Sequence, residues 1–138
     1  MLGGWIFIYT KKALRNAELY PLIEYILQNY MKNILLHDMA NIMNMSESNL
    51  YAVFKKITET TPVQYLNNYR LSTASERLIN SNDSIANISE SAGIADQFYF
   101  SKLFKKKYSL SPQMYRQSTK ISFKKRGCNR YIISPILK

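Results

Sequence analysis

Apolar side chains recur at helical intervals through the middle of the chain. Between residues 47 and 58 they fall at positions i, i+3, i+4 and i+7, namely Leu50, Val53, Phe54 and Ile57. A second segment, 97–108, has a similar apolar face, formed by Phe100, Leu103, Phe104 and Tyr108. Shorter apolar faces occur at about 19–30, 37–43 and 85–92, and a longer one follows Pro62. The pattern predicts an all-α chain.

The two patterned segments belong to an internal repeat. Phe54-Lys55-Lys56 recurs as Phe104-Lys105-Lys106, an offset of fifty residues. The further pairs at this offset are Leu50 with Phe100, Pro62 with Pro112, and Tyr65 with Tyr115. Upstream the offset is forty-nine residues, as in Met39 with Ile88, Ala40 with Ser89, and Asn44 with Gly93. Two copies of one supersecondary unit, one with a residue inserted at its turn, explain this register.

Each copy has the layout of a helix, a tight turn and a second helix. In the first copy, the small Ala40 suits a close helix crossing and Asn44 suits a left-handed turn, a conformation that Gly93 adopts more easily in the second copy. Ser46 and Asp83 are the expected N-caps of the helices that begin near residues 47 and 85. This is the spacing of a helix-turn-helix, and its repetition predicts two such units, at about 36–58 and 85–108.

A connecting helix is expected between the two units. Pro62 suits its first turn, and a length of roughly 16 to 18 residues gives about 25 Å at 1.5 Å per residue. Such a connector would hold two recognition helices about one turn of DNA apart, ~34 Å.

The charge balance favours an anionic partner, and the scarcity of chemistry-bearing residues argues against an enzyme. The chain has 19 Lys and Arg against 9 Asp and Glu, a net charge of +10, which is typical of proteins that bind a polyanion. Cys128 is the only cysteine and His37 the only histidine, so an internal disulfide and a Cys/His zinc site are excluded. We find no paired carboxylates in a pocket-like segment and no glycine-rich phosphate loop. We therefore expect no catalytic residue, metal or cofactor.

The N-terminal apolar run, Trp5 to Tyr9, is far shorter than the ~20 residues that a membrane span needs. It also lacks the cleavage pattern of a signal peptide. We therefore expect a cytoplasmic protein without membrane contact.

Lysine pairs occur late in the second helix of both copies, and this repetition favours phosphate contacts over a merely solvated face. Backbone amides at the starts of the two helices would add to them. The expected phosphate contacts are Ser46, Lys55, Lys56, Asp96, Lys105 and Lys106. In the segment 97–108 we also expect Ser101 and Lys107 to be exposed.

The run from about Leu19 to Arg116 resembles the C-terminal DNA-binding domain of the AraC/XylS family of bacterial transcription activators. The first unit matches through Met45-Ser46, Phe54-Lys55-Lys56 and Pro62-x-x-Tyr65, and the connector through Tyr69-Arg70-Leu71-x-x-Ala74. The second unit is the more diagnostic, with Ala92-Gly93-Ile94, Phe98-Tyr99-Phe100-Ser101-x-x-Phe104-Lys105 and Ser111-Pro112-x-x-Tyr115-Arg116. These motifs are highly specific and cover most of the chain.

The resemblance implies a homeodomain-like domain of seven helices, with two helix-turn-helix lobes joined by a central connector helix. It implies binding to double-stranded promoter DNA through two adjacent major grooves, with RNA polymerase as a further partner. Base contacts of the family map onto Ser48, Tyr51, Ala52, Gln97, Phe98, Ser101 and Lys102, to which we add Asn49 and Tyr99. Ala52 departs from the commoner arginine-rich pattern, since its methyl group can contact only a thymine methyl. Arg70 is expected to tie the connector to the lobes.

The expected domains are an N-terminal linker or remnant (1–18), the DNA-binding domain (19–117) and a basic C-terminal tail (118–138). The first segment is too short for the sensor domain that larger family members carry, so a short regulator and a piece of a larger protein both remain open. Two other functions also stay open. One is nonspecific or architectural binding of nucleic acid, and the other is a protein-interaction module that uses Trp5 to Tyr9.

Overall fold

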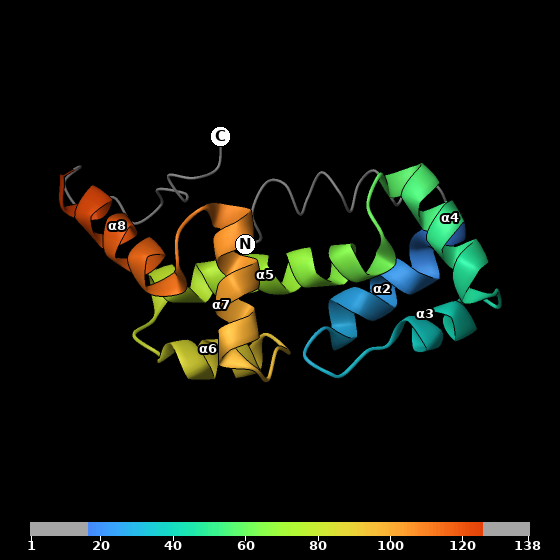
Figure 1. Cartoon of the computed structure of the whole chain (residues 1–138), viewed down its shortest axis with the longest axis horizontal. Coiled ribbons are helices and arrows are strands. Elements are labelled where there is room, and N and C mark those ends of the chain that lie inside the picture. Colours follow the sequence, from blue (N-terminus) through green and yellow to red (C-terminus); the bar gives the residue numbers. More distant parts are fainter. Residues whose placement is uncertain (1–16, 126–138) are drawn as a thin grey trace. The chain divides into compact units, whose positions relative to one another are not determined.

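The computed structural model describes the backbone of residues 17–125 and the side chains of residues 18–120 (Figure 1). This part of the chain holds a short 3-10 helix and seven α-helices: η1 (Ala17–Leu19), α2 (Tyr20–Asn29), α3 (Leu36–Ile42), α4 (Glu47–Thr58), α5 (Pro62–Asn80), α6 (Ile85–Ser91), α7 (Gln97–Tyr108) and α8 (Pro112–Lys125). No strand occurs among these residues, and the expected all-α fold of seven helices is confirmed. None of the described helices is long and apolar enough to cross a membrane. Trp5 to Tyr9 and Cys128 lie outside the described residues.

The chain divides into two compact units, one ending at Ser72 and the other beginning at Thr73. The boundary falls inside α5, whose 19 residues exceed the expected connector by a few. Its first part therefore belongs to the first unit and its second part to the other. Each unit contains one of the two predicted helix-turn-helix pairs.

The first unit packs η1, α2, α3, α4 and the beginning of α5 around one apolar core. The core residues are Leu19, Leu22, Ile23, Ile26, Ile34, Met39, Ala40, Leu50, Phe54, Tyr65 and Leu66. The rings of Phe54 and Tyr65 meet edge to face, with centroids 5.5 Å apart and planes at 77°. Val53 and Ile57 are half-buried against this core, so the predicted apolar face of α4 is confirmed.

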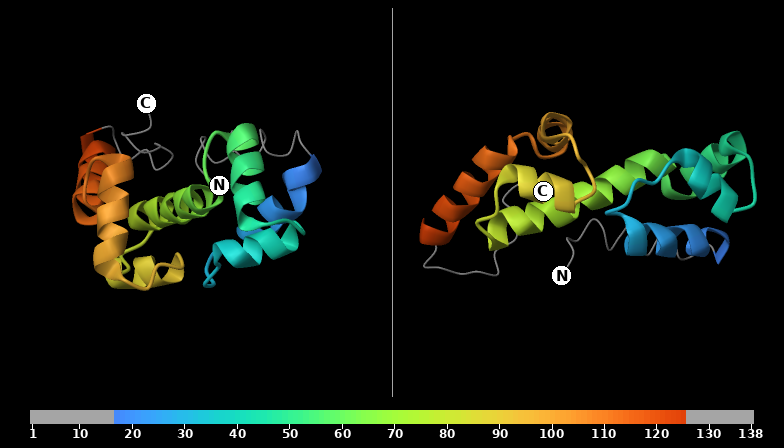
Figure 2. Two further views of the ribbon diagram at one scale, coloured as in Figure 1. Left: turned by 45° about the vertical axis from the view of Figure 1, so that its right-hand side comes forward. Right: turned by 90° about the horizontal axis from the view of Figure 1, so that it is seen from below.

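The second unit repeats this packing and adds further aromatic side chains to it. Phe104 and Tyr115 meet edge to face at 5.2 Å and 84°, as Phe54 and Tyr65 do in the first unit. Phe100 and Tyr108 extend the cluster on either side of Phe104, with ring centroids 5.7 Å and 4.5 Å away. Within this unit α7 runs steeply across the C-terminal part of α5 (Figure 2). The structural equivalence of the two pairs confirms the repeat.

The two turns confirm the left-handed conformations and place the inserted residue. Asn44 has φ 55° and Gly93 has φ 93°. After each turn one backbone N–H returns to the preceding helix, from Met45 to Ala40 O at 3.1 Å and from Ile94 to Ser89 O at 3.0 Å. The register is forty-nine up to this bond and fifty from the next cap onward, so Ala95 is the insertion.

One helix start differs from the sequence prediction, and the last helix runs past residue 117. The N-cap of α6 is Ser84, whose Oγ accepts from the Asn87 N–H at 3.1 Å, and the prediction of Asp83 was wrong by one residue. The Asp83 carboxylate instead accepts from the Arg77 guanidinium, which lowers the pKa of that carboxyl. Helix α8 continues to Lys125, eight residues past the expected domain end, because residues 118–125 contain neither Gly nor Pro to stop it.

Candidate nucleic-acid interface

Helix α4 begins at a side-chain cap and presents a polar face. The Ser46 Oγ accepts from the Asn49 N–H at 3.1 Å, which leaves neighbouring first-turn amides directed out of the helix. The base-contact candidates of this helix, Ser48, Asn49, Tyr51 and Ala52, are all exposed. Ser48, Tyr51, Ala52 and Lys55 stand at i, i+3, i+4 and i+7 and therefore share one face.

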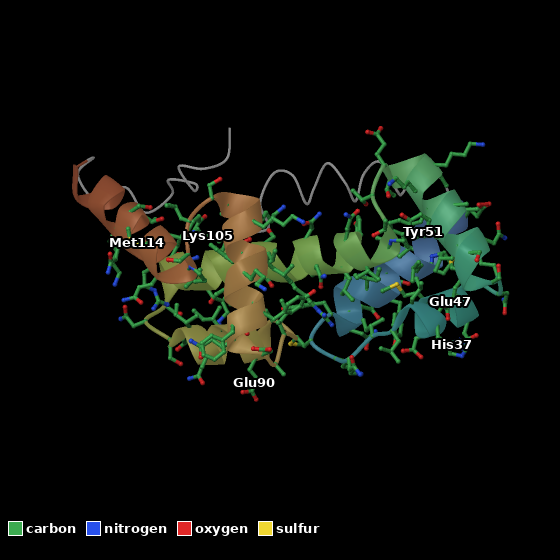
Figure 3. The ribbon with its side chains drawn as sticks, in the orientation of Figure 1. His37, Glu47, Tyr51, Glu90, Lys105 and Met114 are labelled. Carbon is green, nitrogen blue, oxygen red and sulfur yellow. The ribbon has the colours of Figure 1, made fainter. Side chains whose placement is uncertain are left out.

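Two interactions made by side chains of α4 were not predicted from the sequence. His37 of α3 and Glu47 of α4 approach to 3.6 Å, both exposed, and place a carboxylate in the first turn of α4 (Figure 3). One helical turn past Tyr51, the Lys55 Nζ lies 5.9 Å from the centre of the tyrosine ring. This i, i+4 contact restricts the tyrosine, and the spacing of a cation after an aromatic residue was the available signal.

Helix α7 also begins at a side-chain cap, which accepts two hydrogen bonds in place of one, and it exposes a different set of side chains. The Asp96 Oδ1 accepts from the N–H groups of Phe98 at 2.9 Å and Tyr99 at 3.3 Å. Gln97, Phe98, Tyr99 and Lys102 are exposed, and Phe98 reaches 83% exposure. Ser101 is half-buried, so the prediction that it is exposed was wrong. It occupies the place that Tyr51 holds in the first unit.

The lysines late in each helix divide into exposed and half-buried ones. Lys55, Lys56, Lys105 and Lys106 are exposed in the last turns of α4 and α7, as expected of phosphate-binding residues (Figure 3 labels Lys105). Lys107 was predicted to be exposed but is half-buried, and burial lowers its pKa to about 8. Lys107 matches Ile57 at an offset of fifty residues and stands on the apolar face of α7, so the repeat itself contained the signal.

Electrostatics distinguish the two helices. Helix α7 carries four lysines and no acidic residue, whereas α4 carries two lysines and Glu47. Positive charge attracts the phosphate backbone irrespective of sequence. Helix α7 is therefore the more cationic of the two recognition helices.

An arginine in each unit joins the unit's last helix to the end of its first α-helix. The Arg70 guanidinium of α5 donates to Tyr30 O at 2.8 Å and to Lys32 O at 2.7 Å, which confirms its predicted structural role within the first unit. Arg116 of α8 donates to Leu78 O at 3.0 Å and Asp83 O at 2.8 Å. No role was predicted for Arg116, which lies one helical turn before Lys120, the position equivalent to Arg70. These bonds hold α5 against the end of α2 in the first unit and α8 against the end of α5 in the second.

Comparison with known proteins agrees with this arrangement. A family model described as a helix-turn-helix domain matches residues 39–118. The chain is 36% identical over 110 residues to the raffinose operon transcriptional regulatory protein RafR of Pediococcus pentosaceus, covering 79% of this chain and 40% of that protein. It is 35% identical over 109 residues to the lactose operon transcription activator of Staphylococcus xylosus, covering 79% of this chain and 39% of that protein. The chain thus spans about two fifths of the length of these curated relatives.

A solved structure is similar across the same region. The C-terminal domain of AraT, a response regulator from Geobacillus stearothermophilus, superposes with a TM-score of 0.71 and 27% sequence identity. The match covers 75% of this chain and 86% of that one. With the family model matching more than half of its residues, the chain belongs to the AraC-type family of helix-turn-helix DNA-binding proteins.

Proposed function

We propose that the chain regulates transcription by binding promoter DNA with α4 and α7 in two adjacent major grooves. The observation that carries the proposal is the duplicated recognition helix: each copy starts at an N-cap, exposes a polar face and ends in exposed lysines. In a helix-turn-helix the residues at the start of the second helix contact base edges, while the flanking groups contact phosphates. The relatives named as operon regulators support this function.

Each candidate residue has a role in this proposal. Base edges meet Ser48, Asn49, Tyr51 and Ala52 from α4, and Gln97, Phe98, Tyr99, Ser101 and Lys102 from α7. Phosphates meet the exposed lysine pairs and the amides that follow Ser46 and Asp96. Because Ser101 is half-buried, its hydroxyl contributes less than the side chains of its exposed neighbours. We assign more of the base discrimination to Gln97 and Lys102 than to the first unit.

The proposal extends to partners and location. One relative is named a transcription activator, which supports activation and a contact with RNA polymerase. The relatives are longer than this chain, which is consistent with a sensor domain elsewhere in such proteins. Bacterial promoter DNA lies in the cytoplasm, and the proposal places the chain there with no catalytic step of its own.

Selection from a random DNA pool followed by footprinting tests the proposal. Bound sequences should converge on two motifs separated by about one helical turn, ~10 base pairs. On the selected DNA, footprinting should show protection of two neighbouring major-groove segments on one face of the duplex. One short footprint, or no enriched sequence, would contradict the proposal.

The net charge of +10 favours one alternative, which is nonspecific binding of nucleic acid. The variant Lys102→Ala separates the two functions. Specific recognition predicts a loss of roughly 1–3 kcal/mol at the selected site and a smaller loss on scrambled DNA. A nonspecific binder would weaken to the same extent on both. Lys32→Ala, in the loop after α2, is the matched control, and we expect it to change neither affinity.

A further inference from the structure

Neither recognition helix contains an arginine. The sequences of α4 and α7 supply their cations as lysines, and all but Lys102 lie in the last turn of their helix. Bidentate contacts from Arg or Lys to O6 and N7 are the commonest way to recognise guanine. Bidentate recognition of guanine from positions ahead of the last turns of these helices is therefore confined to Lys102. The remaining leading-turn side chains suit other bases.

Phe98 is the most exposed of the large apolar side chains among the described residues, at 83%. It is the second residue of α7, and its N–H is bonded to the Asp96 Oδ1 at 2.9 Å, which fixes the backbone of the first turn. A phenyl ring has no hydrogen-bond donor or acceptor. In the major groove, the apolar group available to it is the C5-methyl of thymine.

The other exposed groups near the helix starts favour A·T pairs as well. Ala52 of α4 offers only a methyl group, which suits a thymine methyl. Asn49 and Gln97 carry amides, and an amide bonds to N6 and N7 of adenine in a bidentate manner. The first halves of the two helices thus combine apolar groups for thymine with amides for adenine.

We infer that the DNA half-sites are rich in A·T pairs and that Phe98 recognises the C5-methyl group of a thymine in the half-site bound by α7. The inference rests on the proposed function, because it requires α7 to lie in the major groove. It goes further by naming the base composition of the target and the side chain that recognises one chemical group on it.

Replacement of thymine by uracil removes the methyl group and changes nothing else in the groove. On DNA selected by the wild-type chain, each thymine is replaced in turn and the Kd is measured. We expect one uracil in the α7 half-site to weaken binding about fourfold, the value of one buried methyl group. Phe98→Ala should weaken binding to thymine DNA and show no difference between thymine and uracil at that position.

Matched variants keep the test independent of folding. Phe98→Leu retains an apolar side chain and should retain the sensitivity to uracil. Ser48→Ala, the equivalent position in the first unit, should retain it too. Because Phe98 is exposed, the thermal unfolding of Phe98→Ala should match that of the wild type.

The outcomes separate this inference from the proposed function. Enriched sequences that are rich in G·C pairs, or a uracil effect that Phe98→Ala preserves, would overturn the inference and leave the proposed function standing. A pool without any enriched sequence would overturn both.

Discussion

At the scale of single residues, Lys107 shows how the second unit departs from its repeat. The equivalent Ile57 is half-buried beside an apolar core, and a lysine in that place carries a charge into the same setting. Its Nζ lies 5.6 Å from the centre of the Tyr108 ring, and burial lowers its pKa to about 8. Since the charged form is the one that desolvation penalises, the lysine destabilises the folded state at neutral pH.

Lys107→Met should therefore stabilise the second unit, and the gain should depend on pH. Below pH 8 the folded and unfolded states both carry the charge, so the full penalty applies. Between about pH 8 and 10.5 the unfolded state binds more protons, so the stability of the wild type rises toward that of the variant. Urea denaturation of the wild type and the variant at pH 7 and pH 10 would measure how far the difference in their free energies of unfolding decreases.

The exposed neighbour provides the control for that experiment. Lys106→Met should change the urea concentration at the midpoint of unfolding little at either pH, because the side chain of Lys106 is already exposed to solvent. A gain for Lys107→Met that is the same at both pH values would show that the stabilisation comes from packing and not from removal of a desolvated charge.

At the scale of helices and turns, the two units place different residues at the same left-handed turn position. Asn44 adopts φ 55°, inside the left-handed helical region that Asn tolerates, whereas Gly93 adopts φ 93°, where a Cβ atom is more strained. Gly93→Ala should cost roughly 1–2 kcal/mol of stability, and Asn44→Gly should be nearly neutral. Chemical denaturation of both variants checks this order, and equal losses would show that backbone strain does not distinguish the turns.

Replacement of either arginine should destabilise only the unit in which that arginine forms its hydrogen bonds. Arg116→Met removes the donors to Leu78 O and Asp83 O, and we expect a loss of about 1–3 kcal/mol. Hydrogen exchange should speed up in α6 and α7 but not in α3 and α4. Arg70→Met should give the opposite distribution, and the exposed Lys120→Met on α8 should give neither. Uniform acceleration in all four helices would contradict this separation.

The helix pattern predicted some elements to the residue and missed others for physical reasons. Helices α4 and α7 match their predicted bounds because cap, apolar spacing and helix end agree. Asp83 and Ser84 are both good caps, and the ion pair of Asp83 with Arg77 leaves the cap to Ser84. Lys107 was misplaced because its residue type was given more weight than its register. The roles of Arg70 and Arg116 as donors depend on carbonyls more than thirty residues away, which no local pattern specifies.

At the scale of the whole molecule, positive charge is distributed unequally between the two recognition helices, so we expect them to contribute unequally to the electrostatic attraction to DNA. The net charge of +10 promotes binding to any DNA, and the four lysines of α7 concentrate that attraction in the second unit. In the proposed complex, the side chains that meet base edges add a sequence-dependent contribution to this attraction. Salt dependence and sequence dependence should therefore be separable by substitution.

Lys105→Ala should reduce the steepness of log Kd against log salt by about one unit, the contribution of one phosphate contact. Its effect should be the same on the selected site and on scrambled DNA, because phosphates carry no sequence information. Lys55→Ala, its equivalent in α4, should act in the same way, and Lys32→Ala should leave the slope unchanged. Fluorescence anisotropy from 50 to 300 mM salt provides the slopes. If Lys105→Ala weakened only the selected site, Lys105 would contact a base, and the face of α7 that lies in the groove would extend to its last turn.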